Sequence, residues 1–373
     1  MESKASYFVI ILAAGYATRL RPLSDKIPKP LIDINGKSII SRIISNFRKA
    51  GFTKFCIVLG YKKEAIKKEV LKNKDLEILF VEQKHPIGMA DAILLSMNHI
   101  MQNVENINNF FITAADILFS KNKIIKIFNL YKNTKAEIIL SLMKSHDIEI
   151  AKGHGNVEIS KDSDVVNDID PTRGLIITDI IEKPKAHEIL SEYYSLPLYL
   201  VNQNLISNLE RIKISTRGEK EFQDAIKKAI IQGDKIRGIN IITHLITHNN
   251  IGQYHLTNLK DIIKMNNRFL QDLTSDEIKN ESIKIVEPVR VNHDFIIDNN
   301  VLLGPYVIVG KNCKIGKHSK LSNVILFDKA DIGNYCELNW CILDENVTIS
   351  DNSCLKDCFI TKNQKNQLEI INF

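Results

Sequence analysis

The chain has 373 residues, of which 44% are hydrophobic and 25% charged, and its formal net charge is +6. This balance excludes an intrinsically disordered chain, a collagen-like chain and a small disulfide scaffold, and the length predicts two domains. The lysines are spread along the whole chain, which indicates no nucleic-acid-binding stripe but does favour polyanionic substrates.

The first apolar stretch covers residues 7–14 and leads directly into the charged segment TRLRPLSDK. The charged continuation favours a buried strand over a secretory signal peptide. No apolar run approaches the roughly 18 residues that cross a bilayer. We therefore expect a cytoplasmic protein with no membrane partner, whose six cysteines are thiols.

Short apolar runs rich in Ile, Val and Phe alternate with helical patterns up to about residue 270; the runs are residues 7–13, 54–59, 77–81 and 109–113. In SIISRIISNFRKAG, apolar residues recur every three or four positions between Ser38, a good N-cap, and Gly51. The alternation of strand and helix predicts a doubly wound, mostly parallel α/β sheet.

After about residue 283 the pattern becomes a repeat of six residues. Aliphatic residues recur in steps of six, interrupted by two longer intervals, at Ile297, Leu303, Val309, Ile315, Leu321, Ile332, Leu338, Ile349 and Leu355. Small or β-branched residues follow most of them four positions later, at Val301, Val307, Cys313, Ser319, Cys336 and Ser353. This pattern is typical of a left-handed parallel β-helix with three hexapeptides per coil, and it predicts about four coils. We therefore expect a domain over 1–270, a β-helix over 283–362 and a C-terminal tail over 363–373.

Four cysteines, Cys336, Cys341, Cys354 and Cys358, have a spacing that could suggest a zinc site. The six-residue repeat, however, already places Cys336 at a small inward position, where a thiol packs as a compact apolar group. We predict packing and no metal there.

A loop with the features of an anion-binding site follows the first strand. Small residues allow the backbone to approach a ligand, Arg19 offers a planar fork for phosphate oxygens, and Lys29 lies between two prolines. A Walker A loop and a G-x-G-x-x-G dinucleotide fingerprint are both absent. The residues expected at the anion are Ala13, Ala14, Gly15, Thr18, Arg19 and Lys29.

The segment GYATRLRPLSDKIPKPL resembles the N-terminal signature of the sugar-phosphate nucleotidyltransferases, which join a nucleoside triphosphate (NTP) to a sugar 1-phosphate. The family pattern is G-x-G-T-R-L followed by P-K-P-L or P-K-A-L, and Ala17 stands where its second glycine is usual. The resemblance implies that the backbone of residues 13–15 contacts the nucleotide, Arg19 the triphosphate and Lys29 a phosphate. A C-terminal hexapeptide domain is also common in this family.

Further segments resemble family motifs in the same order along the chain: EQKHPIGMADAI, FFITAAD, HGNVEI, IIEKP and GEKEFQDAI. The resemblance implies Gln83 and Gly88 at the nucleobase, Asp116 on a metal ion, Gly155, Glu182 and Tyr199 at the sugar, and Lys183 on the sugar phosphate. Where the family has W-x-D-x-G, this chain reads HNNIG, so the second metal ligand would be Asn250. An amide oxygen brings no charge, so Mg²⁺ would be held more weakly there than by a carboxylate.

The resemblance implies in-line displacement of pyrophosphate by the sugar 1-phosphate, assisted by Mg²⁺, with Arg19, Lys29, Asp116 and Lys183 as catalytic residues. Two alternatives stay open: a non-catalytic regulatory relative, which Asn250 favours, and a bifunctional enzyme with an acyltransferase site at His318. The sequence leaves thymidylyl, uridylyl and guanylyl transfer open, as well as the sugar. We expect a homo-oligomer formed through the β-helix.

Overall fold

The computed structural model describes residues 4–160, 172–242, 244–270, 282–292 and 294–373. The contacts divide the chain into two units. The first contains residues 1–17, 27–32 and 38–251, and the second contains residues 18–26, 33–37 and 252–373. The second unit therefore includes short N-terminal segments that the expected boundary near residue 270 assigns to the first domain.

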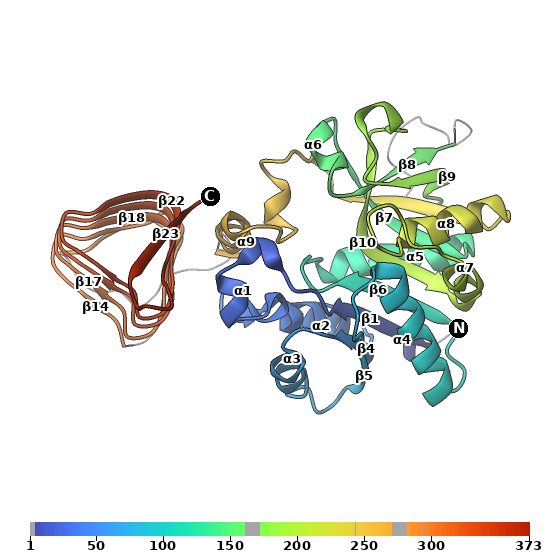
Figure 1. The fold of residues 1–373 in the computed structure, drawn as a ribbon, viewed down its shortest axis with the longest axis horizontal. Helices are drawn as coiled ribbons and strands as arrows, with labels where there is room; N and C mark the ends of the chain where they lie inside the picture. The colour runs from blue at the N-terminus through green and yellow to red at the C-terminus, as the bar shows by residue number, and fades with distance from the viewer. Residues whose placement is uncertain (1–3, 161–171, 243, 271–281, 293) are drawn as a thin grey trace. The chain divides into compact units, whose positions relative to one another are not determined.

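Nine strands in the described part of the first unit form one sheet, in the order β5-β4-β1-β6-β10-β7-β11-β9-β8 (Figure 1). They are β1 (Tyr7–Ala13), β4 (Lys54–Leu59), β5 (Glu77–Glu82), β6 (Asn109–Ala114), β7 (Ile138–Lys144), β8 (Gly155–Ile159), β9 (Leu175–Glu182), β10 (Tyr193–Asn202) and β11 (Ile236–Ile242). The four strands predicted from apolar runs are all present, which confirms the α/β prediction.

The prediction of a mostly parallel sheet needs a correction. Strand β1 is parallel to β4 and β6, and β4 is parallel to β5, but β10 runs antiparallel to both β6 and β7. The connection from β9 to β10 holds only a short 3₁₀ turn, η4 (Ala186–Glu188). This connection carries the chain from β9, near the β8 edge, into the middle of the sheet, where β10 lies between β6 and β7 and runs antiparallel to both, so the sheet is mixed.

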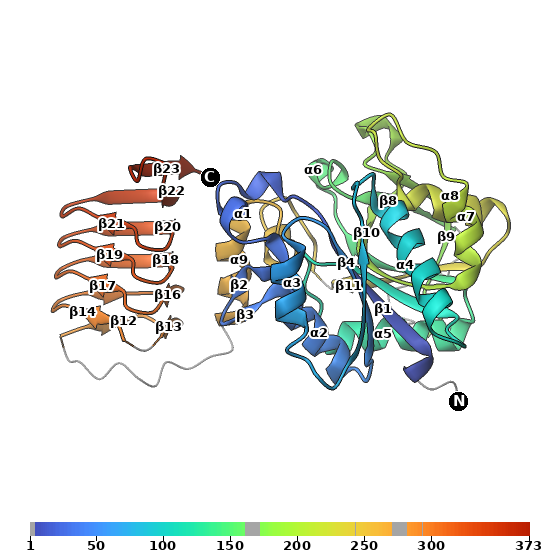
Figure 2. The ribbon, with the colours of Figure 1, turned by 60° about the horizontal axis from the view of Figure 1, so that its bottom comes forward.

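Helices cover both faces of this sheet (Figures 1 and 2). Phe8 and Ile10 of β1 belong to a core with α4 (Met89–Asn103), α7 (Ile206–Glu210) and α8 (Phe222–Ile231). Tyr7 points to the other face, where its ring packs 5.3 Å from that of Phe128 on α5 (Lys121–Thr134). Neighbouring residues of a strand face opposite sides, so an apolar run such as YFVIILA is buried on both.

The predicted helix caps are also present. Helix α2 (Ile39–Lys49) begins after Ser38, whose Oγ accepts a hydrogen bond from the Ser41 backbone N–H at 3.3 Å, and Gly51 follows its end with φ +91°. The remaining helical elements of the first unit are α3 (Lys63–Val70), α6 (Ile148–Ala151), η1 (Lys4–Ser6), η3 (Lys29–Leu31), η5 (Gln203–Leu205) and η6 (Ile251–Gln253), whose last two residues belong to the second unit.

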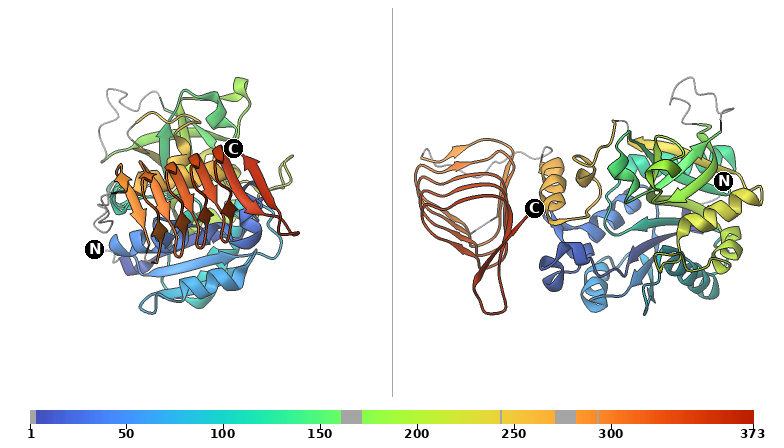
Figure 3. Two further views of the ribbon diagram at one scale, coloured as in Figure 1. Left: turned by 90° about the vertical axis from the view of Figure 1, so that its left-hand side faces the viewer. Right: turned by 45° about the horizontal axis from the view of Figure 1, so that its top comes forward.

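Short parallel strands are stacked in successive coils in the second unit, as in a β-helix (Figures 2 and 3). Lys320 pairs with Glu337, 17 residues later, so one coil takes about three hexapeptides. The strands are β12 (Lys284–Ile285), β13 (Val289–Val291), β14 (Ile296–Ile297), β15 (Leu302–Leu303), β16 (Val307–Val309), β17 (Lys314–Ile315), β18 (Lys320–Leu326), β19 (Asp331–Ile332), β20 (Glu337–Leu343), β21 (Thr348–Ile349) and β22 (Cys354–Lys362). Strands β14, β17, β19 and β21 form a ladder of four in the described residues, matching the predicted number of coils.

The six-residue repeat supplies the core of this solenoid. The inward positions Val301, Val307, Cys313, Ser319 and Cys336 are buried, as are most of the aliphatic partners. Cys341 and Cys358 are buried on adjacent coils with their sulfurs 3.7 Å apart, whereas Cys354 is exposed. The packing interpretation is therefore confirmed for the buried thiols.

The expected tail over 363–373 contains a further strand, β23 (Leu368–Asn372), antiparallel to β22. The rest of the second unit consists of η2 (Thr18–Leu20), α1 (Leu23–Lys26), α9 (Leu259–Leu270) and the small β2 (Asp33–Ile34), which pairs with β3 (Lys37–Ser38). Helix α9 packs against β18, β20 and β22. None of the helices in the described ranges has the length and hydropathy needed to span a membrane.

The core between β1 and α4 can be tested at Ile10, which is fully buried. Replacing Ile10 with Ala removes buried side-chain carbons and leaves a cavity. We therefore expect the free energy of unfolding, measured by urea denaturation, to fall by about 2–5 kcal/mol. The control is Ile231→Ala, at a side chain that is 76% exposed, where we expect little change. Equal effects of the two substitutions would contradict the assigned core.

Candidate active site

A lysine and an aspartate form an ion pair beside a hollow at the carboxyl ends of β1 and β6. Lys29 Nζ lies 2.6 Å from Asp116 Oδ2, and the two side chains are 18% and 23% exposed. Since β1 and β6 are parallel neighbours, their ends meet at one edge of the sheet and bring together residues 87 positions apart. The hollow, of about 130 Å³, is also lined by Ala13, Gly15 and Ala17.

Local backbone structure holds the lysine side of the hollow. Pro28 has an extended conformation, with φ −63° and ψ 141°, and the Leu31 N–H donates to its carbonyl at 2.8 Å. Lys29 and Pro30 therefore begin a 3₁₀ turn, η3, in which the proline fixes the backbone next to the lysine. The two prolines predicted to fix this backbone flank Lys29 at the start of the turn, while the rigidity of the segment stays a prediction.

The opposite side of the hollow is made by the loop after β1. A Cβ added to Gly15 would meet no atom within 4 Å, so this backbone borders open space. Gly60 supports the loop from behind, because its own Cβ would come within 2.5 Å of the Ala14 carbonyl oxygen, which also accepts the Tyr61 N–H at 3.3 Å. Sequence reasoning missed Gly60 and Tyr61, although a glycine directly after β4 at the same sheet edge was a usable signal.

The two residues predicted for the nucleobase lie together. Gln83 is buried, and its Nε2 donates to the Gly88 carbonyl at 3.2 Å and to Asp91 Oδ2 at 3.0 Å. Gly88 has φ +121°, and a Cβ there would approach the Lys220 backbone to 2.5 Å. The backbone N–H of Lys220, a residue that sequence reasoning did not single out, donates a hydrogen bond to the Ile87 carbonyl at 2.6 Å.

The residues predicted for the sugar side also meet. Gly155 pairs with Glu182 across β8 and β9, and a Cβ on Gly155 would lie 2.8 Å from Ser195 Oγ. Glu182 Oε1 lies 3.6 Å from Lys183 Nζ, while Glu182 Oε2 is buried with no hydrogen-bond partner in the described part of the chain. Burial raises the pKa of Glu182 to about 7, against the opposing effect of the Lys183 charge.

A second ion pair beside Glu182 was not predicted. Arg217 Nη1 donates to the Glu182 carbonyl oxygen at 3.3 Å, and Arg217 Nη2 lies 2.9 Å from Glu221 Oε1. Glu221 is 5% exposed and also accepts from Ser215 Oγ at 3.0 Å. Its negative charge contributes to the raised pKa of Glu182. These residues join the predicted sugar motif to the segment that contacts Gly88.

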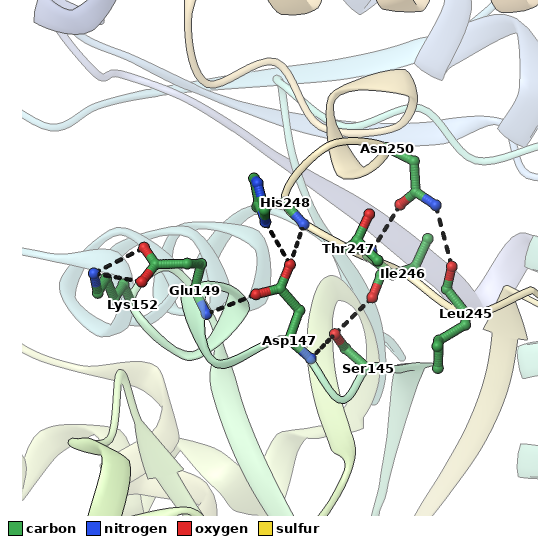
Figure 4. A network of polar contacts seen from close by, with 9 residues as sticks. All are labelled: Ser145, Asp147, Glu149, Lys152, Leu245, Ile246, Thr247, His248 and Asn250. Atoms are coloured by element: carbon green, nitrogen blue, oxygen red, sulfur yellow. Dashed lines mark hydrogen bonds and ion pairs between the residues drawn. The ribbon is translucent and has the colours of Figure 1, made fainter.

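Two predicted ligands have local partners in the structure. Tyr199 is buried in the core with its ring 5.0 Å from that of Phe222. Asn250 Oδ1 accepts the Thr247 N–H at 2.9 Å, and its Nδ2 donates to the Leu245 carbonyl at 3.1 Å (Figure 4). Sugar contact by Tyr199 and metal ligation by Asn250 stay predictions.

The same loop is tied to Asp147, whose Oδ2 accepts both the backbone N–H of His248 at 2.7 Å and its ring Nδ1 at 2.6 Å (Figure 4). The His248 backbone N–H lowers the pKa of Asp147. Thr18 and Arg19 lie in the second unit, in η2, where the Thr18 carbonyl accepts the Arg21 N–H at 3.2 Å. Their contacts with a nucleotide also stay predictions.

The residues at the hollow fit a magnesium ion that is shared with a substrate. Mg²⁺ is usually held by one or two carboxylates together with substrate phosphates rather than by a cage of protein ligands. Asp116 supplies one such carboxylate at the hollow. The described residues contain no cluster of three His, Cys, Asp or Glu side chains able to form a cage.

The departure from the family pattern at Ala17 has a measurable cost. Ala17 has φ +52°, in the left-handed region that costs an L-residue about 1–2 kcal/mol. We expect Ala17→Gly to raise the free energy of unfolding by about 0.5–1 kcal/mol, because glycine adopts this conformation without a steric penalty. The control Ala65→Gly, at an exposed position inside α3, should lower it by about 1 kcal/mol. A loss of stability in both variants would contradict the left-handed Ala17.

The raised pKa of Glu182 predicts a pH dependence of stability. The folded state holds this proton more tightly than the unfolded state, so the stabilisation is complete below about pH 4.5 and is lost as the pH rises toward about 7. Between pH 5 and pH 8, the free energy of unfolding of the wild type, measured in urea, should fall by on the order of 3 kcal/mol. This fall should be absent in Glu182→Gln. Glu210→Gln, at an exposed carboxylate, is the control. Parallel pH profiles for wild type and Glu182→Gln would refute the assignment.

Comparisons with known proteins show similarity over both parts of the chain. The family model "Nucleotidyl transferase" matches residues 8–241, and the model "GMPPB C-terminal domain" matches residues 285–365. A "Bifunctional protein GlmU" of Methanococcus maripaludis is 28% identical over 361 residues, covering 95% of this chain and 77% of that protein. The "UTP--glucose-1-phosphate uridylyltransferase AglF" of Haloferax volcanii is 28% identical over 233 residues, covering 62% of this chain and 87% of that protein.

The fold is similar to the crystal structure of a UDP-glucose pyrophosphorylase complexed with UDP-glucose, with a TM-score of 0.58 and 18% identity. That likeness covers 72% of this chain and 99% of the other. The family match extends over more than half of the chain and includes both strands that carry the Lys29–Asp116 hollow. The chain therefore belongs to the sugar-phosphate nucleotidyltransferase family, as its N-terminal motif predicts.

Proposed function

We propose that this protein joins UTP to a glucose-like sugar 1-phosphate, giving a UDP-sugar and pyrophosphate. The observation that carries the proposal is the Lys29–Asp116 pair, which lies against the small-residue loop at the end of β1. The family match supports the reaction class. The activity named for the Haloferax relative supports UTP and a glucose phosphate as the substrates to test first.

The reaction is an in-line displacement at the α-phosphorus of UTP. An oxygen of the sugar 1-phosphate forms a bond to this phosphorus, and the bond from the phosphorus to the bridging oxygen of pyrophosphate breaks. The attacking oxygen is already an anion at neutral pH, so no general base is needed. The main obstacle is the Coulomb repulsion between two polyanions, which positive groups at fixed positions reduce.

The chain supplies these positive groups from both sides of the reacting phosphorus. Lys29 and Arg19 hold the triphosphate, with the backbone of residues 13–15 as hydrogen-bond donors, while Lys183 holds the sugar phosphate. Glu182 accepts hydrogen bonds from sugar hydroxyls. Mg²⁺, when bound to Asp116 and Asn250, supplies further positive charge to the phosphate oxygens.

The C-terminal solenoid is proposed to be a left-handed parallel β-helix that forms homo-oligomers. A second activity there has one supporting observation, His318, whose ring is stacked on that of Tyr335 at 4.9 Å. The relatives named as bifunctional support an acyl-transfer site as the alternative. Acyl transfer from acetyl coenzyme A to a sugar phosphate, lost in His318→Ala, is its test.

An activity panel distinguishes these functions. Pyrophosphate release is measured with UTP, dTTP or GTP, each with glucose 1-phosphate, N-acetylglucosamine 1-phosphate or mannose 1-phosphate. We expect the highest kcat/KM with UTP. A preference for dTTP or GTP would replace the proposed nucleotide. Binding of a UDP-sugar without turnover by any pair would identify a regulatory relative instead.

Lys183 tests the sugar-phosphate side of the proposal. Replacing Lys183 with Ala removes one cation from the attacking phosphate, which should cost about 2.7–4 kcal/mol of barrier, or about 10²–10³-fold in kcat/KM for the sugar phosphate. The matched control is Lys185→Ala, an exposed lysine two residues later. Unchanged kinetics in Lys183→Ala, with the fold intact by circular dichroism, would remove Lys183 from the site.

A further inference from the structure

A polar cluster in the second unit joins the end of α1, where the Lys26 side chain is 48% exposed, to two buried side chains of the solenoid. Lys26 Nζ forms an ion pair with Asp344 Oδ2 and also donates to Thr361 Oγ1 at 3.1 Å. Thr361 Oγ1 in turn donates to the same Asp344 oxygen at 2.6 Å. Asp344 is 2% exposed and Thr361 1%, and they follow one another 17 residues apart on adjacent coils.

Asp344 and Thr361 border the apolar core of the solenoid. Their preceding neighbours, Leu343 and Ile360, are buried in the solenoid core. A carboxylate in such a place loses its hydration and is retained at low cost only if it is paired and hydrogen-bonded. Asp344 meets this condition, because Oδ2 is paired with Lys26 and Oδ1 accepts the Glu345 N–H at 2.8 Å. Lys26 thus compensates a charge that the solenoid would otherwise bury alone.

Lys26 is the last residue of a compact segment that begins at Thr18. Within this segment the Arg21 N–H donates to the Thr18 carbonyl at 3.2 Å, and the Arg21 guanidinium lies 3.1 Å from Asp25 Oδ1. These contacts connect η2, which carries Arg19, to α1, which ends at Lys26. A restraint on Lys26 therefore limits the positions that Arg19 can take.

We propose that Lys26, Asp344 and Thr361 form a latch by which the C-terminal solenoid positions Arg19 for the triphosphate. The expected effect of the latch on the reaction rests on the proposed function. The restraint that the latch places on residues 18–26 does not depend on the proposed function. Lys26 and Asp344 are then positioning residues, and the solenoid contributes to nucleotide binding as well as to assembly.

The chain offers a matched control for this cluster. Lys260 Nζ lies 2.6 Å from Asp357 Oδ1, so this second ion pair also joins a helix to the solenoid. Lys260, however, belongs to α9, and α9 contains no residue that is predicted to bind phosphate. Its side chain and that of Asp357 are 34% and 37% exposed. A variant that loses this pair shows whether any general destabilisation of the second unit, rather than loss of the Lys26 contact, changes residues 18–26.

The experiment compares the full-length wild type with Lys26→Met, Asp344→Asn, the double variant Lys26→Met/Asp344→Leu, and the control Lys260→Met. The double variant leaves no unpaired buried charge, so it keeps the test valid if a single variant fails to fold. Lys26→Arg should retain the ion pair and serve as the conservative rescue. Amide hydrogen exchange of residues 18–26 is measured without substrate, and steady-state kinetics are measured with UTP and glucose 1-phosphate.

We expect at least tenfold faster exchange over residues 18–26 in the latch variants, and a KM for UTP raised about tenfold with the KM for glucose 1-phosphate unchanged. Lys260→Met and Lys26→Arg should stay within twofold of wild type. A lower melting temperature without these two changes would show a merely structural pair and overturn the proposal. If wild type releases no pyrophosphate in the panel, the proposed function fails, and unaltered exchange of residues 18–26 would then overturn the latch separately.

Discussion

The contact between Lys29 and Asp116 is the interaction on which the rest of the site depends. Opposite charges 2.6 Å apart, both partly shielded from water, mark the place where two distant segments meet at one sheet edge. Only the parallel order of β1 and β6 brings their carboxyl ends together, and only small residues in the loop after β1 leave a hollow beside the pair. The fold thus places a cation, an anion and exposed backbone around one volume, which is what the reaction of two polyanions requires.

Around Glu182, at the predicted sugar motif, burial and neighbouring charges determine the electrostatics. There the carboxylate of Glu182 is buried beside Glu221, and the pKa of Glu182 is raised to about 7 by burial first. Arg217 and Lys183 bring positive charge to the same place. Lys183 and Arg217 thus offset the charge of two close carboxylates here, whereas Lys29 is paired with a single carboxylate at the hollow. The segment from Ser215 to Glu221 contacts both Gly88 and Glu182, which makes it the physical link between the nucleobase and sugar motifs.

Much of the fold could be predicted because its signals are periodic and local. Buried strands such as β1, the capped helix α2 and the six-residue repeat each leave a pattern within a short window. The antiparallel direction of β10 was not predictable in this way, because it depends on the pairing of β10 with β6 and β7, which are distant in sequence. Among the predicted site residues, Gln83 contacts Gly88 and Gly155 pairs with Glu182, while their contacts with a nucleobase and a sugar stay predictions. The contacts of Lys220, Arg217 and Lys26 were missed, because partners far apart in sequence leave no local period.

The most direct test of the central claim is a crystal structure of the protein with UTP and Mn²⁺ in place of Mg²⁺. We expect triphosphate density in the hollow, within hydrogen-bond distance of Lys29 Nζ and of the backbone of residues 13–15, and an anomalous Mn²⁺ peak at the Asp116 carboxylate. Triphosphate bound elsewhere, or a metal peak away from Asp116 with the Lys29–Asp116 pair undisturbed, would contradict it.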